Sequence, residues 1–318
     1  MRPTNTTHSY LRNPLDQILG YPANIQLLRI LIETGRGMST GEIAGRTGLS
    51  VPGVHKVISR LLETGFIEQQ NSGKTQLTSL RKSHPIASDL IRLFQAEKKQ
   101  LINLTDSLKS IAGELKQQPT SVWIYGDVAK GTDDYGDPLQ LAVYGPPRTT
   151  DLITSNYRDS IVQQQIERKF DVTIEVRAVT AAETELVKDP NKILLWGFDP
   201  NQIPDSSDSA SEKTKHHNQF DQQALTDANV WAGFLKAHPE VIERTKDSLK
   251  QKLKDEKSGT KAELQEWYRL LNSMSFQRLK KFLQSDSERS VRLRQSLPFW
   301  PVLTQAEREK FKTLAGKK

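Results

Sequence analysis

Two helix-capping segments separated by a turn glycine constrain the fold of this chain more than any other feature of its sequence. Ser39 with Glu42 three residues later forms a capping-box pattern, in which the two side chains satisfy free amide donors at a helix start. Gly48 then allows a tight turn. Ser50 can cap a second helix, and Pro52 stands in its first turn, where its missing amide costs nothing. The pattern predicts two short helices joined by a turn.

The segments on either side extend this pattern. Apolar residues at helical spacing predict a preceding helix from Pro22 to about Thr34. Gly65 ends the second capped helix. A strand at 66–69, a turn at 71–74 and a returning strand to about residue 78 follow. This order of elements predicts a winged helix-turn-helix, and the alternative is a small helical domain with an incidental hairpin.

The helix that begins after Ser50 is the expected recognition helix. If it lies in a major groove, its apolar stripe packs inward and its other face meets base edges and phosphates. The candidate DNA-binding residues on that face are Ser50, Gly53, His55, Lys56, Ser59 and Arg60. Lys74 at the wing tip, with Arg81 and Lys82, is expected to contact the backbone or the minor groove. For each of these residues the alternative is an ordinary solvated side chain.

The segment of residues 121–145 consists of two apolar strands around a glycine-containing loop. It resembles the signature of the DNA polymerase beta-like nucleotidyltransferases, in which Gly-Ser, a basic-Gly pair and a Ser-Asp-hydrophobic-Asp motif stand between two strands. The resemblance aligns the family's serine with Asp127, its first metal aspartate with Pro138 and its second with Gln140. The positions that carry this alignment are Gly126, Asp127, Lys130, Gly131, Pro138 and Gln140.

The chain departs from that signature at the positions that bind metal and phosphate in the family. In the working enzymes the paired aspartates hold Mg²⁺ ions that neutralise a triphosphate. Pro138 offers no side-chain ligand, and Gln140 offers only a neutral carbonyl. At about 4 Å from a phosphate oxygen, the Asp127 carboxylate costs roughly 4 kcal/mol at an effective dielectric of 20. We therefore expect a pseudoenzyme without catalytic residues, metal or cofactor.

The alternative is an active nucleotidyltransferase that uses Asp133, Asp134 or Asp137. It is weaker because two carboxylates share a strand face only at alternate positions, and Asp133 and Asp134 are adjacent in a loop. After a helix at 150–169, alternation predicts a half-buried strand at 170–177. Its outward face carries Asp171, Thr173, Glu175 and Arg177. Asp171 or Glu175 is either a remnant of the family's third carboxylate or part of an ordinary solvated face.

Several short segments in the first half of the chain add to this picture. Together they resemble prokaryotic winged-helix regulators fused to a nucleotidyltransferase-like domain, over about residues 13–185. The resemblance implies a transcriptional regulator. The segments are Asn13-Pro14-Leu15-Asp16 with Leu19-Gly20, Thr40-Gly41-Glu42-Ile43-Ala44, Ser50-Val51-Pro52, Ser83-His84-Pro85-Ile86, and Leu90 with Leu93-Phe94.

Charge is unevenly distributed along the chain. The net charge is +5 over residues 1–85, −7 over 86–230 and +9 over 231–318. A polyanion is therefore expected to bind the two ends. The absence of cysteine excludes disulfides and thiolate metal sites. No apolar run approaches the roughly 18 residues that a bilayer span needs, so we expect a cytoplasmic, nucleoid-associated protein.

The complete prediction is an α+β chain in four parts. A winged helix-turn-helix occupies 1–85, a helix (86–116) plus the degenerate nucleotidyltransferase-like α/β domain 86–198, a linker 199–219, and a basic helical domain 220–318. The linker's His216-His217 pair is expected to be solvated rather than metal-binding. We expect a homodimer on double-stranded DNA, formed through helix 86–116 or the carboxy-terminal helices. The last region could bind a protein partner, and an antitoxin-like protein is the third alternative.

Overall fold

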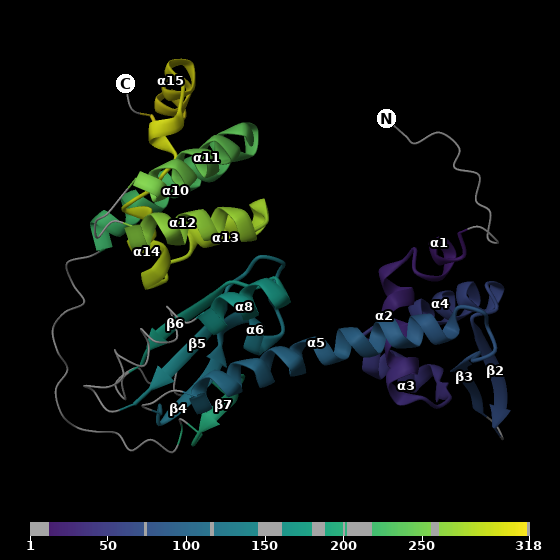
Figure 1. Cartoon of the computed structure of the whole chain (residues 1–318). Coiled ribbons are helices and arrows are strands. Elements are labelled where there is room, and N and C mark those ends of the chain that lie inside the picture. Colours follow the sequence, from purple (N-terminus) through teal and green to yellow (C-terminus); the bar gives the residue numbers. More distant parts are fainter. Residues whose placement is uncertain are drawn as a thin grey trace. The chain divides into compact units, whose positions relative to one another are not determined.

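The computed structural model describes residues 13–72, 75–114, 118–145, 161–179, 188–199, 201, 218–255 and 261–316. The contacts divide the chain into two compact units, Met1–Asn103 and Leu104–Lys318 (Figure 1). Lys74, His216 and His217 lie outside the described residues, as does most of the expected linker. None of the helices in the described ranges is long and apolar enough to cross a membrane.

The first unit has the element order that its capping pattern predicts. Ser39 accepts a hydrogen bond from the Glu42 amide, and Gly48 ends that helix with a φ of 70°. The Glu42 carboxylate pairs with Arg36 instead of completing the capping box. The helices of this unit are α1 (Leu15–Ile18), α2 (Pro22–Thr34), α3 (Thr40–Thr47), α4 (Val51–Glu63) and the first half of α5 (Ala87–Glu114).

A small antiparallel sheet completes the first unit. The predicted hairpin is confirmed as β2 (Ile67–Ser72) and β3 (Thr75–Leu80), paired from Ile67 opposite Leu80 to Ser72 opposite Thr75. A third strand, β1 (Met38–Ser39), pairs with β3 and was not predicted. The sheet order is therefore β1-β3-β2, which is the sheet of a winged helix.

Helix α5 contributes to both hydrophobic cores. Leu90 and Phe94 pack into the core of the first unit, whereas Leu104 and Leu108 pack into that of the second. In the stretch between these two groups, Leu101 and Ile102 remain exposed, and so does Leu93 directly before Phe94.

The second unit is built on a mixed four-stranded sheet of order β6-β5-β4-β7. Strand β5 pairs antiparallel with β4 and parallel with β6, and β7 pairs antiparallel with β4. Helix α6 follows β4 directly, and residues 131–138 connect it to β5. The elements are β4 (Ser121–Tyr125), α6 (Gly126–Lys130), β5 (Leu139–Tyr144), α8 (Ile161–Phe170), β6 (Ile174–Ala178) and β7 (Ile193–Gly197).

The carboxy-terminal part of this unit is helical, as predicted. Its core contains an aromatic group around Trp231, Trp267, Phe299 and Phe311. A capping box at Thr304 begins the final helix, as the sequence indicated. The elements are α10 (Asn218–Ala237), α11 (Glu240–Asp255), α12 (Lys261–Ser273), α13 (Phe276–Gln284), α14 (Glu288–Arg294), η2 (Trp300–Val302) and α15 (Gln305–Leu314).

The strand expected at 170–177 begins later than its alternation suggested. Phe170 is the last residue of α8, and Asp171 turns the chain with a φ of 53°. β6 starts only at Ile174. The expected solvated outer face was wrong at Thr173 and Glu175, which are 1% and 4% exposed, whereas Asp171 and Arg177 are exposed. The carboxy-terminal helices cover this face, which a strand pattern by itself cannot reveal.

Candidate functional site

The exposed face of α4 follows from how this helix is held. The Ser50 hydroxyl accepts the Gly53 amide at 3.2 Å and so fixes the start of the helix. One stripe of α4 packs into the core of the first unit, and it consists of Val54, Val57, Ile58 and Leu61. Because that stripe is anchored, the opposite side of the helix faces solvent.

Most of the predicted recognition residues lie on that solvent-facing side. His55, Lys56 and Ser59 are exposed, and Gly53 is half-buried. Ser50 is exposed too, but its hydroxyl serves as the helix cap. His55, Lys56 and Ser59 are therefore the side chains that α4 presents most openly to a partner.

Arg60 is held differently. Its guanidinium lies over the Tyr21 ring, with 4.1 Å between the Cζ atom and the ring centroid. Its Nε atom is buried and has no hydrogen-bond partner among the residues that the structure describes. Stacking on an aromatic ring orients a guanidinium without using its terminal donors. Tyr21 was not singled out from the sequence, and a Tyr just before a helix gives no signal of this contact.

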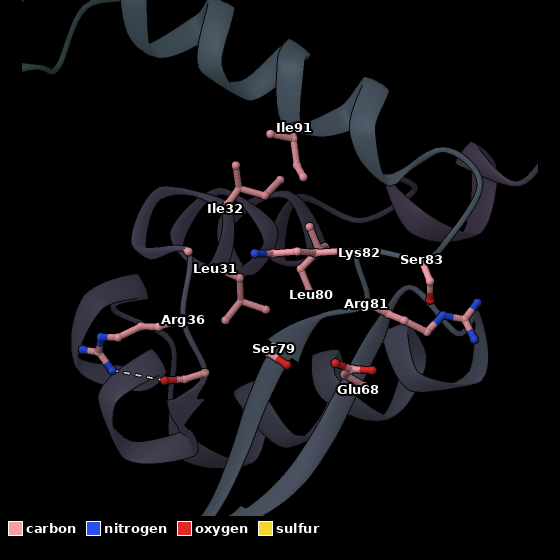
Figure 2. Close-up of a pocket in the computed structure, with 12 residues that line it drawn as sticks. Leu31, Ile32, Arg36, Glu68, Ser79, Leu80, Arg81, Lys82, Ser83 and Ile91 are labelled. Atoms are coloured by element: carbon pink, nitrogen blue, oxygen red, sulfur yellow. Dashed lines mark hydrogen bonds between the residues drawn. The ribbon is translucent and has the colours of Figure 1, made fainter.

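Arg81 and Lys82 lie where β3 ends, at the opposite end of the hairpin from its turn. The Arg81 guanidinium packs over Gly65, where an added Cβ would lie 3.2 Å from the Arg81 Nη2. Both residues line a cavity of about 510 Å³ (Figure 2). Their predicted contact with DNA therefore has to be made from the base of the wing rather than from its tip.

A row of polar side chains crosses the sheet of the second unit. Tyr125 on β4 is opposite Gln140 on β5, and Gln140 is opposite Glu175 on β6. All three line a cavity of about 340 Å³. Gly126, at the start of α6, has a φ of 75°, and a Cβ there would lie 2.0 Å from the Gln140 Oε1. The Gln140 amide thus lies directly against the backbone of the loop.

The other aligned loop positions surround this row. Asp127 is exposed in the first turn of α6, and Lys130 ends that helix. Gly131 is its left-handed C-cap, with a φ of 70°. Pro138 is half-buried directly before β5.

Glu175 is the buried carboxylate of this site. Burial raises the pKa of its carboxyl, against hydrogen bonds from Ser285 and Ser287. The Ser285 hydroxyl donates to the Glu175 Oε2 at 2.9 Å, and no described group forms a hydrogen bond with the Glu175 Oε1. Asp171 instead pairs with Arg278 at the turn before the strand.

The loop aspartates are either paired with other groups or exposed to solvent. The Asp137 carboxylate accepts the Asp134 amide at 2.8 Å and pairs with the Lys281 ammonium at 2.7 Å. The hydrogen bond from Lys281 is the main cause that lowers the pKa of Asp137. Asp133 and Asp134 are exposed. Lys281, on α13, was not predicted to belong to this site, because it is far away in the sequence.

Several arginines of the basic carboxy-terminal region are internal. Arg278 is 2% exposed, and its Nη1 lies 2.6 Å from the Asp171 Oδ1. Arg289 is 8% exposed and bridges Glu167 and Glu266 at 2.9 and 2.8 Å. These charges join the helices to the sheet, so they do not add to a surface for a polyanion.

One group of side chains in the described part of the chain has the spacing of metal ligands. It consists of His238, Glu240 and Glu307, whose ligand atoms lie within 4.8 Å of one another. Arg244 contacts both Glu307 oxygens, at 2.6 and 2.7 Å. That hydrogen bonding is the main cause that lowers the pKa of Glu307 to about 2. A cation already occupies the carboxylate that a metal ion would need.

Comparison with known proteins identifies one part of the chain. The family model described as winged helix-turn-helix DNA-binding matches residues 23–68. This range runs from α2 to the start of β2 and includes the whole of α3 and α4. The first unit therefore contains a winged helix-turn-helix DNA-binding domain. No curated protein and no solved structure gave a match.

Proposed function

We propose that the protein is a transcriptional regulator that recognises double-stranded DNA through α4 and the wing. The observation that carries this proposal is the matched winged-helix domain, whose capped helix α4 presents His55, Lys56 and Ser59 to solvent. A helix of this kind places side chains against base edges in a major groove, while the wing contacts the backbone. Arg60, oriented by Tyr21, retains terminal donors that suit the acceptors of a guanine.

For the second unit we propose a catalytically inactive nucleotidyltransferase-like domain that acts as a scaffold or ligand sensor. The order α5-β4-α6-β5-α8-β6 supports this, since it places the loop of Gly126 between two paired strands. Glu175, the remaining carboxylate, lies beside Gln140. With Pro138 and Gln140 at the aligned metal positions, this lone carboxylate cannot hold two metal ions.

The geometry of the loop weighs against the alternative of an active enzyme. Asp137 would be the best substitute ligand, but it is neutralised by Lys281. A metal ion bound there would have to displace an ammonium ion that is tethered to α13. The exposed Asp133 and Asp134 lack a shared strand face.

Selection from random DNA tests the regulator proposal. The full chain should enrich a short motif from a pool of random duplexes. In a gel shift with the selected duplex, Arg60→Ala should weaken binding by about 1–3 kcal/mol if Arg60 reads a guanine. Lys74→Ala should weaken selected and scrambled duplexes alike. A pool that shows no enrichment would contradict sequence-specific recognition.

A transfer assay tests the proposal of inactivity. The protein should transfer no nucleotide from any labelled triphosphate in the presence of Mg²⁺. Restoring Asp127→Ser, Pro138→Asp and Gln140→Asp together should recover Mg²⁺-dependent triphosphate binding. Transfer by the unaltered protein that disappears in Asp137→Asn would establish the enzyme alternative instead.

A further inference from the structure

The residues that line the cavity of about 510 Å³ in the first unit include none from α4. The cavity lies between the end of α2, the base of the hairpin and the start of α5 (Figure 2). Its volume falls within the range of small-molecule sites in proteins, about 300–1,000 Å³.

One side of the cavity is apolar. Leu31 and Leu80 reach it from the hydrophobic core, and they are 2% and 8% exposed. Ile32 on α2 and Ile91 on α5 are partly buried and complete this side. This apolar surface lines a cavity instead of packing against other side chains. Covering it with an apolar ligand removes it from water, which favours binding.

Three cations line the cavity, Arg36, Arg81 and Lys82, and their side chains are held differently. Arg36 pairs with Glu42 and donates to the Gly37 carbonyl at 3.1 Å. Arg81 points away from Lys82 in Figure 2 and packs over Gly65. Lys82 extends across the cavity towards Leu31 and Ile32. Within the described ranges no carboxylate forms an ion pair with this lysine.

The remaining polar groups of the lining are Glu68, Ser79 and Ser83. Glu68 is the one carboxylate among the residues that line the cavity. Arg81 and Lys82 outnumber it, so the lining carries a net positive charge even when Arg36, which is paired with Glu42, is left out. The two serine hydroxyls can donate hydrogen bonds. A ligand that satisfies this lining needs an apolar body and a single anionic group.

We propose that this cavity is a binding site for a small apolar monoanion, a carboxylate or sulfonate attached to a hydrocarbon or aromatic body. The acidic group pairs with Lys82, and the body covers Ile32, Leu80 and Ile91. Such a ligand contacts both β3 and α5, the helix that continues into the second unit. The site does not depend on the DNA-binding proposal, so a test without DNA decides it.

The test uses two fluorescent probes that share an apolar body. The first is the anionic dye 1-anilinonaphthalene-8-sulfonate, and the second is the uncharged N-phenyl-1-naphthylamine. We expect saturable binding of the anionic dye to the full chain, with a dissociation constant on the order of tens of micromolar. Lys82→Gln should weaken the anionic dye about fivefold or more and leave the neutral dye unchanged. Ile91→Trp, which fills the apolar side, should weaken both dyes about tenfold.

Lys99→Gln is the matched control, since Lys99 is an exposed lysine of α5 outside the cavity lining. This variant should bind both dyes as the unaltered chain does. If the Lys82→Gln variant bound the anionic dye as tightly as the unaltered chain does, the pairing of the ligand's acidic group with Lys82 would be overturned. Unchanged binding of both dyes to Ile91→Trp would overturn the assignment of the cavity. Displacement of the dye by millimolar inorganic phosphate would show a simple anion site and contradict the need for an apolar body.

Discussion

Substitution of Arg289 should uncouple the carboxy-terminal helices from the sheet more strongly than any surface change. The Arg289 Nη1 lies 2.9 Å from the Glu167 Oε1, and its Nε lies 2.8 Å from the Glu266 Oε1. At an effective dielectric of 20, each contact is an attraction of about 6 kcal/mol, which the cost of burying the charges largely offsets. Arg289→Ala removes the attraction but leaves the Glu167 and Glu266 carboxylates buried. We expect a loss of about 3–5 kcal/mol of unfolding free energy.

The position of the tryptophans makes this loss measurable in the second unit alone. All five tryptophans of the chain lie after residue 103, so their fluorescence reports the unfolding of Leu104–Lys318. With a urea slope of about 2 kcal/mol per M, the midpoint should fall by roughly 1.5–2.5 M. Arg168→Ala is the control, because Arg168 is an exposed neighbour of Glu167. A shift no larger than that of the control would refute the reasoning.

The same substitution should also change the response to acid. Burial by itself would raise the pKa of Glu266, but the charge of Arg289 and hydrogen bonds from Arg292 and Arg289 outweigh it and lower the pKa below its usual 4.5. A lowered folded-state pKa stabilises the protein above that usual value, and the stabilisation is lost as pH falls through the folded-state pKa. The difference between Arg289→Ala and the unaltered chain should therefore shrink below about pH 4.5.

Two further substitutions test the loop and the assembly. Gly126→Ala should lower the free energy of unfolding by about 1–3 kcal/mol in the same urea assay, because an alanine there combines a φ of 75° with a clash against Gln140. Gly131→Ala has a similar φ but open space, so it should cost less. Leu101→Glu with Ile102→Glu should turn a dimer into monomers in light scattering, since both side chains are exposed on α5. Monomers of the unaltered chain at micromolar concentration would contradict the homodimer expected from the sequence.

The elements predicted best are those whose signals are local. Ser39 and Ser50 fix helix starts through bonds to amides three residues away, and Gly48 fixes the turn between them. The two apolar strands around the aligned loop also have local signals, since β4 is followed at once by α6 and β5 begins after a connection over residues 131–138. In each case the residues that determine the structure are sequence neighbours.

The features that were missed depend on distant contacts. β1 has only two residues and exists because Met38 pairs with Thr78. Arginine is usually exposed, so nothing in the sequence indicated that Arg278 would be buried against Asp171, 107 residues away. The same coverage buries Thr173 and Glu175, two of the residues on the face that was expected to be solvated.

The most direct test of the account is the affinity of the full chain for DNA, measured by fluorescence anisotropy with a selected duplex and with its scrambled form. Specific binding should exceed non-specific binding by about a thousandfold or more. His55→Ala with Lys56→Ala should remove most of that preference, whereas Lys99→Ala should leave it intact. Equal affinity for both duplexes, or a preference that survives the double substitution on α4, would contradict recognition through this helix.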